Sequence, residues 1–292
     1  MTWEEIIIQI RSKPEYRELV ELSYFEDDLV LNVERFRNSE EFIETLKILK
    51  DNCPAGKILK LADIGAGNGV ASIAFALEGF EVCSIEPDPS MTVGAGAIRK
   101  LKSKLHIDNL QVVEAWGESL PLNSCTFDVV YIRQAMHHAA DLIKFVKEAA
   151  RLILDQGVLL TVRDHVIYNE EDKQWFLRSH PLHQFYGGEN AYTKEQYVEA
   201  LTEAGLKIHR CYQHFDSVIN YFPEKKAVIE KKKLERKNFI EENFIKTIPY
   251  PFNRSKRLLK LYSKRAENKL GPVFDERKIP GRMISFISKK SR

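Results

Sequence analysis

Cysteine is scarce in this sequence of 292 residues, and long apolar runs are absent. The four cysteines form no C-x-x-C pair; they are Cys53, Cys83, Cys125 and Cys211. A short apolar run at residues 6–8 follows two glutamates and precedes Arg11, which suits an amphipathic helix better than a membrane anchor. Without paired cysteines or a signal-peptide pattern, we expect a cytoplasmic protein whose thiols are reduced.

A strong net charge is also lacking. Lys and Arg number 44 against 42 Asp and Glu, so the formal net charge is +2, which argues against a general nucleic-acid binder. Hydrophobic residues make up 44% of the chain and charged residues 29%, as in ordinary soluble proteins. A chain of this length can bury one large core, and we expect a single core with insertions.

Strand-like and helix-like segments alternate through the middle of the chain. Strands are expected at residues 58–64, 80–85, 110–115, 127–132 and 158–162, with helices at 70–78, 90–105 and 141–154 between them. Strands joined by helical crossovers pack as a parallel sheet with helices on both faces. The sequence therefore predicts a doubly wound α/β fold.

Three glycines, Gly65, Gly67 and Gly69, follow the first predicted strand. Glycine permits left-handed backbone angles and lets a ligand approach the turn, which is the usual ligand contact in such sheets. The dinucleotide pattern G-x-G-x-x-G needs glycine or alanine at position 70, but this chain has Val70. The turn is therefore less suited to binding NAD. Glu86 ends the second strand, where a carboxylate can accept both hydroxyls of a ribose or can simply be a solvated acid.

Several ordered stretches resemble the class I S-adenosylmethionine-dependent methyltransferases, in the small-molecule subgroup related to ubiquinone and sterol methyltransferases. They are LADIGAGNG at residues 61–69, SIE at 84–86, GESLPL at 117–122, TFDVV at 126–130, MHH at 136–138 and LILDQGVL at 152–159. The resemblance covers residues 55–165 and implies a Rossmann-like sheet of seven strands with S-adenosylmethionine as the cofactor. It does not specify the methyl acceptor.

The resemblance also implies roles for individual residues around the cofactor. Asp63 and the backbone of Gly65, Ala66 and Gly67 are expected at the amino-acid end, with Glu86 on the ribose. The other expected cofactor contacts are Pro87, Asp88, Gly117 and Glu118 near the adenine, with Arg133 and Gln134 beneath the reactive methyl group. Many relatives carry an acidic residue where this chain has Trp116. We expect the Trp116 ring either to stack on the adenine or to be a core aromatic residue.

The resemblance and the predicted elements divide the chain into five parts. They are an N-terminal helical cap at residues 1–52, the cofactor-binding core at 53–165, an acceptor-side lid, helix and strand at 166–222, a basic helical insertion at 223–280 and a final strand at 281–292. A helix is expected to start at Thr193, with Gln196 completing a capping box, and to end at Gly205.

The histidines are concentrated where the acceptor is expected to bind. A hydroxyl acceptor needs a base, and histidine is suited because its unperturbed pKa is about 6.5. We predict His183, or His180, as the base, assisted by Glu189, in a non-periodic lid hinged at Gly187 and Gly188. The other expected acceptor-side residues are His137, His138, Arg163, Asp164, His165, Tyr186 and Tyr192. Alternatively, His138 is structural and the lid histidines only cap turns.

No metal is expected, because the H-x-x-H spacing of His180 and His183 interrupted by a proline is not the helical pair typical of a metal site, even with Asp164 near.

Positive charge is concentrated in one segment, since residues 225–265 contain fourteen Lys and Arg against four Glu. The segment is either a solvated helical pair or a contact with an anionic membrane or a phosphate-bearing acceptor, and nucleic acid is an unlikely partner.

Three hypotheses for the function follow. The first is O-methylation of a small molecule or sugar, the second is RNA methylation, and the third is a non-catalytic scaffold that binds S-adenosylmethionine.

Overall fold

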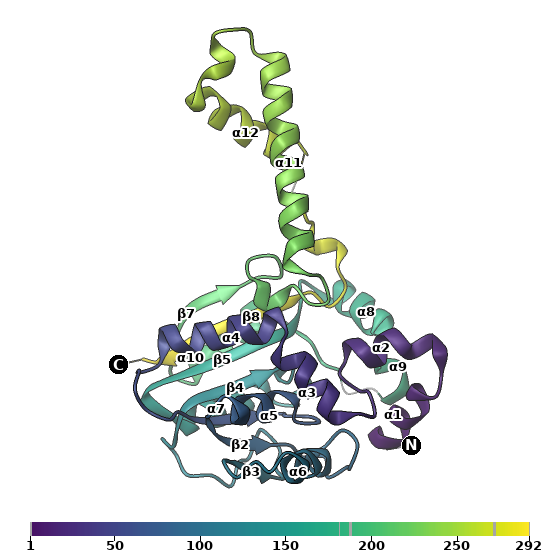
Figure 1. Ribbon diagram of the computed structural model, residues 1–292. Helices are drawn as coiled ribbons and strands as arrows, with labels where there is room; N and C mark the ends of the chain where they lie inside the picture. The colour runs from purple at the N-terminus through teal and green to yellow at the C-terminus, as the bar shows by residue number, and fades with distance from the viewer. Residues whose placement is uncertain (1, 181, 187–188, 271–272, 292) are drawn as a thin grey trace. The chain divides into compact units, whose positions relative to one another are not determined.

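The chain folds into two units in the computed structural model, which describes residues 2–180, 182–186, 189–270 and 273–291 (Figure 1). The larger unit, here called the core unit, comprises Met1–Asn220 and Pro280–Arg292. The smaller, here called the hairpin unit, comprises Tyr221–Ile279.

A single twisted sheet runs through the core unit. Seven of its strands follow the order β3-β2-β1-β4-β5-β8-β7, and the short β6 pairs with β5 off this path. The strands are β1 (Lys60–Ile64), β2 (Glu81–Ile85), β3 (Leu110–Val113), β4 (Phe127–Arg133), β5 (Ile153–Ile167), β6 (Tyr192–Thr193), β7 (Leu206–Tyr212) and β8 (Met283–Lys290). Strands β1 to β5 pair in parallel, whereas β8 is antiparallel to both β5 and β7. The predicted doubly wound α/β fold is confirmed.

The helices lie on both faces of the sheet because the chain travels in two directions from its centre. From β1 it moves through β2 to β3, and from β4 it moves the opposite way to β5. Right-handed crossovers then place the connecting helices on opposite faces. Accordingly, α5 (Val70–Leu77) contacts α3 (Leu29–Arg37) and α6 (Ala95–Lys104), while α7 (Leu142–Leu152) packs with α10 (Lys194–Glu203).

Local sequence explains where these elements begin and why they are buried. Strand β4 is buried at every position from Phe127 to Ile132, as expected for a central parallel strand covered on both faces. The predicted capping box is confirmed, since the Thr193 side chain accepts from the Gln196 backbone and the Gln196 side chain accepts from the Thr193 backbone. Helix α10 therefore starts where the sequence predicts.

The lid segment, which the sequence predicts to be non-periodic, contains regular structure. Strand β5 is longer than predicted and continues to Ile167, and α8 (Glu170–Ser179) follows. Asn169 caps α8 by accepting from the Asp172 backbone, and the acids of the first turn favour a helix N-terminus. The prediction was wrong because α8 buries only Phe176 among its residues and so lacks an apolar period. The short α9 (His183–Tyr186) follows.

Four helices precede the sheet: α1 (Trp3–Arg11), α2 (Arg17–Leu22), α3 and α4 (Glu40–Asn52), with the 3₁₀ turn η1 (Pro14–Tyr16) after α1. Glu41 on α4 is 2% exposed and joins them to the sheet. Its carboxylate accepts from Arg133 Nε at 2.6 Å, at the end of β4, and from Arg163 Nη1 at 2.6 Å, on β5. Burial opposes the charged form of Glu41, but the two guanidinium groups outweigh it and lower its pKa.

The hairpin unit contains two long helices, α11 (Lys226–Thr247) and α12 (Lys256–Leu270), with 3₁₀ turns η4 (Phe252–Arg254) and η5 (Glu276–Lys278). The rings of Phe244 and Tyr262 pack between the helices, with centroids 5.4 Å apart. No helix in the described part of the chain is both long and apolar enough to span a membrane. Two further 3₁₀ turns lie in the core unit, η2 (Met136–His138) and η3 (Val218–Asn220).

Replacing Glu41 with alanine should destabilise the core unit strongly, because two buried guanidinium groups would lose their partner. We expect the free energy of unfolding to fall by about 3 kcal/mol, measured by urea denaturation. Glu34→Gln, an exposed change on α3, is the control and should alter stability by less than about 0.5 kcal/mol. A loss for Glu41→Ala as small as that of the control would contradict the role given to this ion pair.

Candidate functional site

The glycine turn joins β1 to α5 and has the backbone that the sequence predicts. Gly65, Gly67 and Gly69 have φ angles of 73°, 56° and 83°. A Cβ on Gly65 would lie 2.5 Å from the Cβ of Ala135, so this glycine lets the turn pack against the loop that follows β4. Nothing lies within 4 Å of the corresponding position at Gly67. The turn is therefore closed on the β4 side and open for a ligand at Gly67.

Glu86, at the end of β2, lies against this turn. Its Oε2 accepts from the Gly67 backbone at 2.7 Å and its Oε1 accepts from the Asp88 backbone at 3.0 Å, beyond Pro87. The side chain is buried, and burial raises the pKa of Glu86 to about 7. Each carboxylate oxygen keeps a further lone pair for a ribose hydroxyl. The structure thus brings the predicted carboxylate to the predicted turn.

Asp63 lies on β1, two residues before the turn, and is buried. Ser72 Oγ lies 2.6 Å from its Oδ2 and 2.8 Å from Ser84 Oγ, which links β1, α5 and β2. Burial raises the pKa of Asp63 to about 6. Ala66 donates its backbone N–H to the Ile85 carbonyl at 3.1 Å.

The residues expected near the adenine follow β3. Trp116 is 72% exposed, so the interpretation of it as a core aromatic residue is wrong. Gly117 is buried, and a Cβ there would come within 2.1 Å of the Phe145 ring. Glu118 Oε1 accepts from the Ala140 backbone at 3.0 Å, which ties this loop to the one before α7.

Arg133 is the last residue of β4, Gln134 follows it, and Arg163 lies on β5 next to the end of β4. Both guanidinium groups are paired with Glu41, and Arg163 is 3% exposed. Gln134 and Arg163 have left-handed φ angles of 50° and 59°, which cost free energy in residues other than glycine. Such strain is concentrated where a site must be shaped, and here it lies beside the glycine turn.

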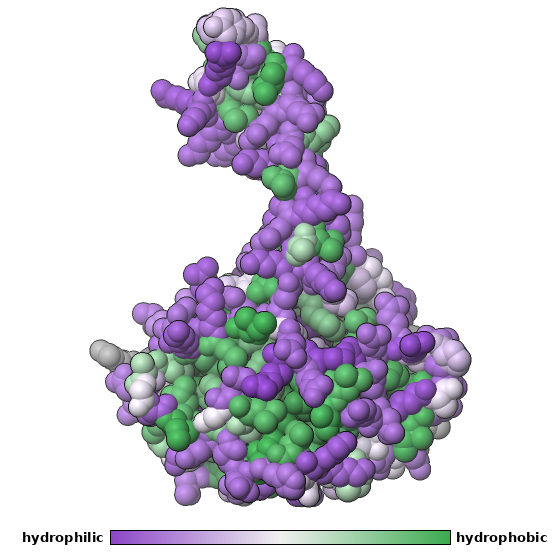
Figure 2. All heavy atoms as spheres, viewed as in Figure 1, coloured by the Kyte–Doolittle hydropathy of each residue, from purple (hydrophilic) through white to green (hydrophobic). Residues whose placement is uncertain are grey.

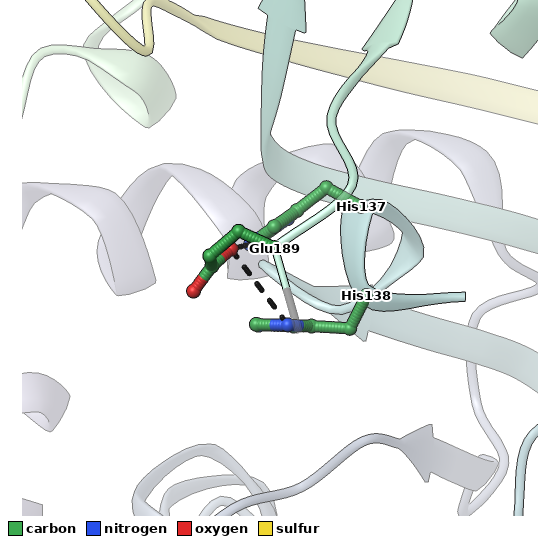
Figure 3. Close-up of side chains that lie close together, drawn as sticks. All are labelled: His137, His138 and Glu189. Carbon is green, nitrogen blue, oxygen red and sulfur yellow. Dashed lines mark ion pairs between the residues drawn. The ribbon is translucent and has the colours of Figure 1, made fainter. Parts of the chain in front are cut away.

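His137 and His138 form η2 just after β4, and the structure places Glu189 beside them (Figure 3). His137 is buried between two carboxylates: its Nδ1 lies 3.2 Å from Asp164 Oδ1, and its Nε2 lies 3.1 Å from Glu189 Oε2. Burial opposes protonation, but the nearby carboxylates of Asp164 and Glu189 outweigh it and raise the pKa of His137 to about 9. These imidazole interactions lower the pKa of Glu189 despite its burial.

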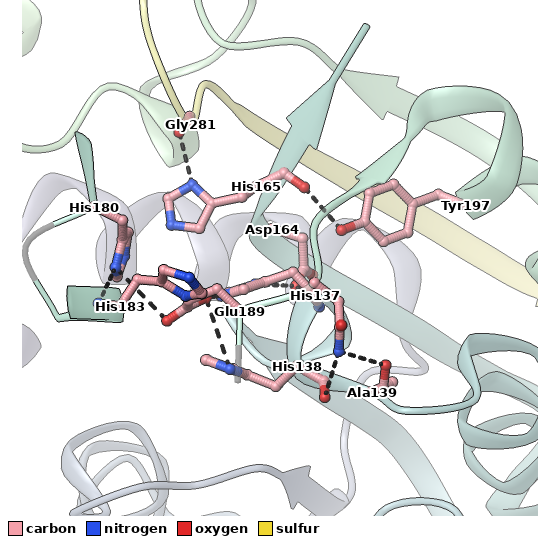
Figure 4. Close-up of polar contacts among 11 residues, drawn as sticks. His137, His138, Ala139, Asp164, His165, His180, His183, Glu189, Tyr197 and Gly281 are labelled. Atoms are coloured by element: carbon pink, nitrogen blue, oxygen red, sulfur yellow. Dashed lines mark hydrogen bonds and ion pairs between the residues drawn. The ribbon is translucent and has the colours of Figure 1, made fainter. Parts of the chain in front are cut away.

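Glu189 also faces the two other imidazoles nearest to it. His138 Nδ1 lies 3.7 Å from its Oε2, and His180 Nδ1 lies 3.7 Å from its Oε1 (Figure 4). His180 Nδ1 accepts from the His183 backbone at 3.3 Å, and burial lowers the pKa of His180. His183 Nδ1 is buried and has no hydrogen-bond partner among the residues that the structure describes.

The remaining predicted acceptor-side residues hold the site together. His165 Nδ1 lies 2.7 Å from the Gly281 carbonyl, and the Tyr197 hydroxyl donates to the His165 carbonyl at 2.8 Å (Figure 4). Burial lowers the pKa of His165 well below its usual range. The Tyr192 hydroxyl donates to the Ala139 carbonyl at 2.5 Å. The Tyr186 side chain and the predicted hinge, Gly187 and Gly188, lie outside the described residues.

Two residues of the site were missed from the sequence. Asn190 donates its backbone N–H to the His137 carbonyl at 3.0 Å and its Nδ2 to the Ala139 carbonyl at 3.1 Å, so it fixes Glu189 next to η2. Only its position after Glu189 could have indicated it. Glu41 could have been found as an acid on the apolar face of an amphipathic helix, since Phe42 and Thr45 beside it are buried.

The N-terminal helices cover the lid segment. Ile6, Ile7 and Ile10 of α1 form a buried cluster against which Leu182 and Phe185 pack. The rings of Tyr16 and Phe185 meet edge to face, with centroids 5.6 Å apart. In addition, Asn68 of the glycine turn donates its Nδ2 to the Tyr24 carbonyl at 2.6 Å. The cap therefore contacts both the glycine turn and the histidine-bearing segment.

Comparison with known proteins agrees with this arrangement. Residues 62–161 match the model of a methyltransferase domain. The chain is 32% identical over 145 residues to the uncharacterized methyltransferase YcgJ of Bacillus subtilis (strain 168), covering 48% of this chain and 54% of that protein. It is 31% identical over 107 residues to the chloroplastic tocopherol O-methyltransferase of Arabidopsis thaliana, covering 36% of this chain and 30% of that protein. The match thus spans about half of the first relative and less than a third of the second.

Solved structures show the same fold. The crystal structure of YcgJ superposes with a TM-score of 0.51 at 17% identity, covering 85% of this chain and 98% of that one. Geranyl diphosphate C-methyltransferase from Streptomyces coelicolor A3(2), in complex with Mg²⁺, geranyl diphosphate and S-adenosyl-L-homocysteine, superposes with a TM-score of 0.55 at 12% identity, covering 85% of this chain and 79% of that one. Residues 62–161 are therefore similar to a methyltransferase domain, and the sheet around the glycine turn has the fold of the methyltransferase structures with which it superposes.

Proposed function

We propose that the protein transfers the methyl group of S-adenosylmethionine to a hydroxyl oxygen of a small molecule or sugar. The observation that carries this proposal is the buried Nδ1 of His183, which has no hydrogen-bond partner among the described residues and belongs to the histidine cluster around Glu189. This cluster follows closely after Ala135, against which Gly65 packs, so the cofactor turn and the cluster share one edge of the sheet. Ligands of open α/β sheets bind at this edge.

The residues of the glycine turn fit the cofactor. The open backbone at Gly67 and the carboxylate of Glu86 suit its amino-acid end and its ribose. When bound, S-adenosylmethionine supplies a methyl group that its sulfonium has made electrophilic. The protein then has to place the acceptor oxygen in line with the methyl group and exclude water.

His183 is the proposed general base, and Nδ1 is the atom that accepts the proton. The acceptor oxygen forms a bond to the methyl carbon as the carbon–sulfur bond breaks, its electron pair stays on sulfur, and the hydroxyl proton moves to His183. His180 holds the His183 backbone through its Nδ1, and Glu189 in turn faces His180. We therefore assign His180 and Glu189 to positioning.

A small acceptor is favoured over RNA by the relatives. One is a tocopherol O-methyltransferase and another is a structure containing geranyl diphosphate, so both names refer to small organic molecules. The convergent imidazoles and carboxylates also favour catalysis over a scaffold without activity, because perturbed pKa values cluster at functional sites.

Binding of S-adenosylmethionine should weaken as the pH falls below 7. The ribose hydroxyls donate to Glu86, and its carboxylate accepts them best when ionised, but burial raises its pKa to about 7. Binding therefore favours the form that predominates above that pH, and affinity should fall by up to about tenfold per pH unit below it. Isothermal titration calorimetry between about pH 5.5 and 8.5 measures this slope. Glu86→Gln should bind weakly with little pH dependence, and an equal slope in the variant would contradict the assignment.

Replacing His183 with alanine should lower turnover by about 10² to 10⁴ and leave S-adenosylmethionine affinity unchanged. Transfer of labelled methyl from the cofactor into cell extract separated into small molecules, glycans, lipids and RNA measures the rate and the acceptor class. His209→Ala, an exposed change on β7, is the matched control. Label recovered mainly in RNA would refute the proposed acceptor class, and full activity of the His183 variant would place the base elsewhere.

We also propose that the hairpin unit docks on an anionic membrane. Its turn between α11 and α12 presents Tyr250 and Phe252, which are 70% and 60% exposed, and hydrophobic side chains lie among hydrophilic ones over this unit (Figure 2). Arg254 lies over the Tyr250 ring at 5.2 Å, and Lys256 and Arg257 follow at the start of α12. Exposed aromatic rings beside cations are typical of contact with an anionic bilayer surface.

The full chain should sediment with vesicles that contain phosphatidylglycerol and much less with vesicles of phosphatidylcholine alone. Replacing Tyr250 and Phe252 together with serine should weaken this binding by about tenfold or more, since both rings lose their apolar burial. Leu234→Ser, at a residue of α11 that is 56% exposed, is the control within the same unit and should have little effect. Equal binding to both vesicle types, or no binding, would contradict the docking.

A further inference from the structure

The side chains of His137, His138 and Glu189, here called the imidazole–carboxylate cluster, converge in a way that the methyl-transfer chemistry alone does not require. Each offers one ligand atom, and the three atoms lie within 4.8 Å of one another. Figure 3 shows the side chains of His137, His138 and Glu189 lying close together. Asn190 fixes the two parts of the chain that carry them, as described above.

The separations of the carboxylate oxygen from the two nitrogens are close to those between ligands of one cation. Nitrogen and oxygen ligands lie about 2.0 to 2.2 Å from zinc, so two ligands of the same ion are about 3 to 3.5 Å apart. Glu189 Oε2 lies 3.1 Å from His137 Nε2 and 3.7 Å from His138 Nδ1. Although it is buried, this oxygen makes no hydrogen bond of good geometry among the described residues. Its position therefore suits a cation placed between it and the two nitrogens.

Asp164 supplies the outer partner that metal-binding histidines usually have. Its Oδ1 lies 3.2 Å from His137 Nδ1, and the residue is fully buried. A carboxylate on one imidazole nitrogen fixes the tautomer and directs the other nitrogen toward a metal. Here the other nitrogen is Nε2, which faces Glu189.

The charge of the region also favours a cation. Asp164 and Glu189 are both buried, and neither pairs with a lysine or arginine among the residues described. The negative charges of these two buried carboxylates are therefore compensated by imidazoles. Buried charges are usually paired or bound to metals. The ring of His138 is 39% exposed, so one side of the cluster is accessible to solvent and to an acceptor.

We propose that His137 Nε2, His138 Nδ1 and Glu189 bind one first-row divalent cation of the zinc class, with a coordination position left open on the side of His138. Two imidazoles and one carboxylate are the ligand set of such catalytic sites. For its role in catalysis, this inference rests on the proposed O-methylation. The acceptor hydroxyl takes the open position, where the cation makes its proton more acidic; that proton moves to His183, and the oxygen attacks the methyl carbon as the carbon–sulfur bond breaks.

Metal binding is tested on the full chain after treatment with a chelator, without cofactor or acceptor. Zinc is titrated in competition with a chromophoric chelator, and cobalt is titrated by its visible absorption. We expect one equivalent of zinc per chain and a cobalt spectrum of four or five ligands. His138→Ala should weaken zinc binding by at least about tenfold, and Asp164→Asn by about 10 to 100-fold through the outer partner. His209→Ala should bind like the unchanged protein.

Zinc binding that is absent, or equal in the unchanged protein and in His138→Ala, would overturn the inference. Because Asp164 is buried, the circular dichroism spectrum of its variant is compared with that of the unchanged protein; if it has lost its fold, His138→Ala decides. Methyl transfer is measured separately. The unchanged protein could bind one equivalent of zinc that His138→Ala does not bind, while no methyl group is transferred to any hydroxyl. That result would count against the proposed function and leave the metal site standing.

Discussion

The carboxylate of Glu41 and the two guanidinium groups that face it set the geometry of the edge where the site lies. A charge buried this deeply is stable only with close partners, and here the partners come from the end of β4 and from β5 beside it. The N-terminal helices are thereby attached over the carboxyl ends of the strands. Both arginines are occupied in the process, so the polar groups that remain beside the glycine turn are mainly the imidazoles and acids of the histidine cluster.

Much of the fold and of the cofactor side could be predicted because the relevant signals are local. Alternating strands and helices determine a doubly wound sheet, and the glycines after the first strand determine the turn. Glu86 directly follows β2, as predicted, and its carboxylate accepts from the Gly67 backbone. The predicted start of α10 at Thr193 likewise depends on neighbours within one turn of helix.

The rest depends on contacts between residues far apart in the sequence. Glu41 meets Arg163 across 122 residues, and Asn190 meets Ala139 across 51. No local pattern carries such pairings. Helix α8 was missed for another reason, since its caps are strong but its apolar face is almost absent. Trp116 shows the opposite error: an aromatic residue at a strand end suggested burial, yet the chain turns there and leaves the ring in solvent.

The order of the last two strands has a consequence for how this chain can vary. The hairpin unit leaves the core after η3 and returns before β8, and the Asn220 Oδ1 and Ser285 Oγ at this junction are 2.6 Å apart. Both ends of the insertion are thus held by the core itself. Since the entropy of closing a loop changes by only about 0.6 kcal/mol when its length doubles, segments of very different size could occupy this place while the sheet stays intact. The junction is therefore a point where evolution can exchange one inserted segment for another.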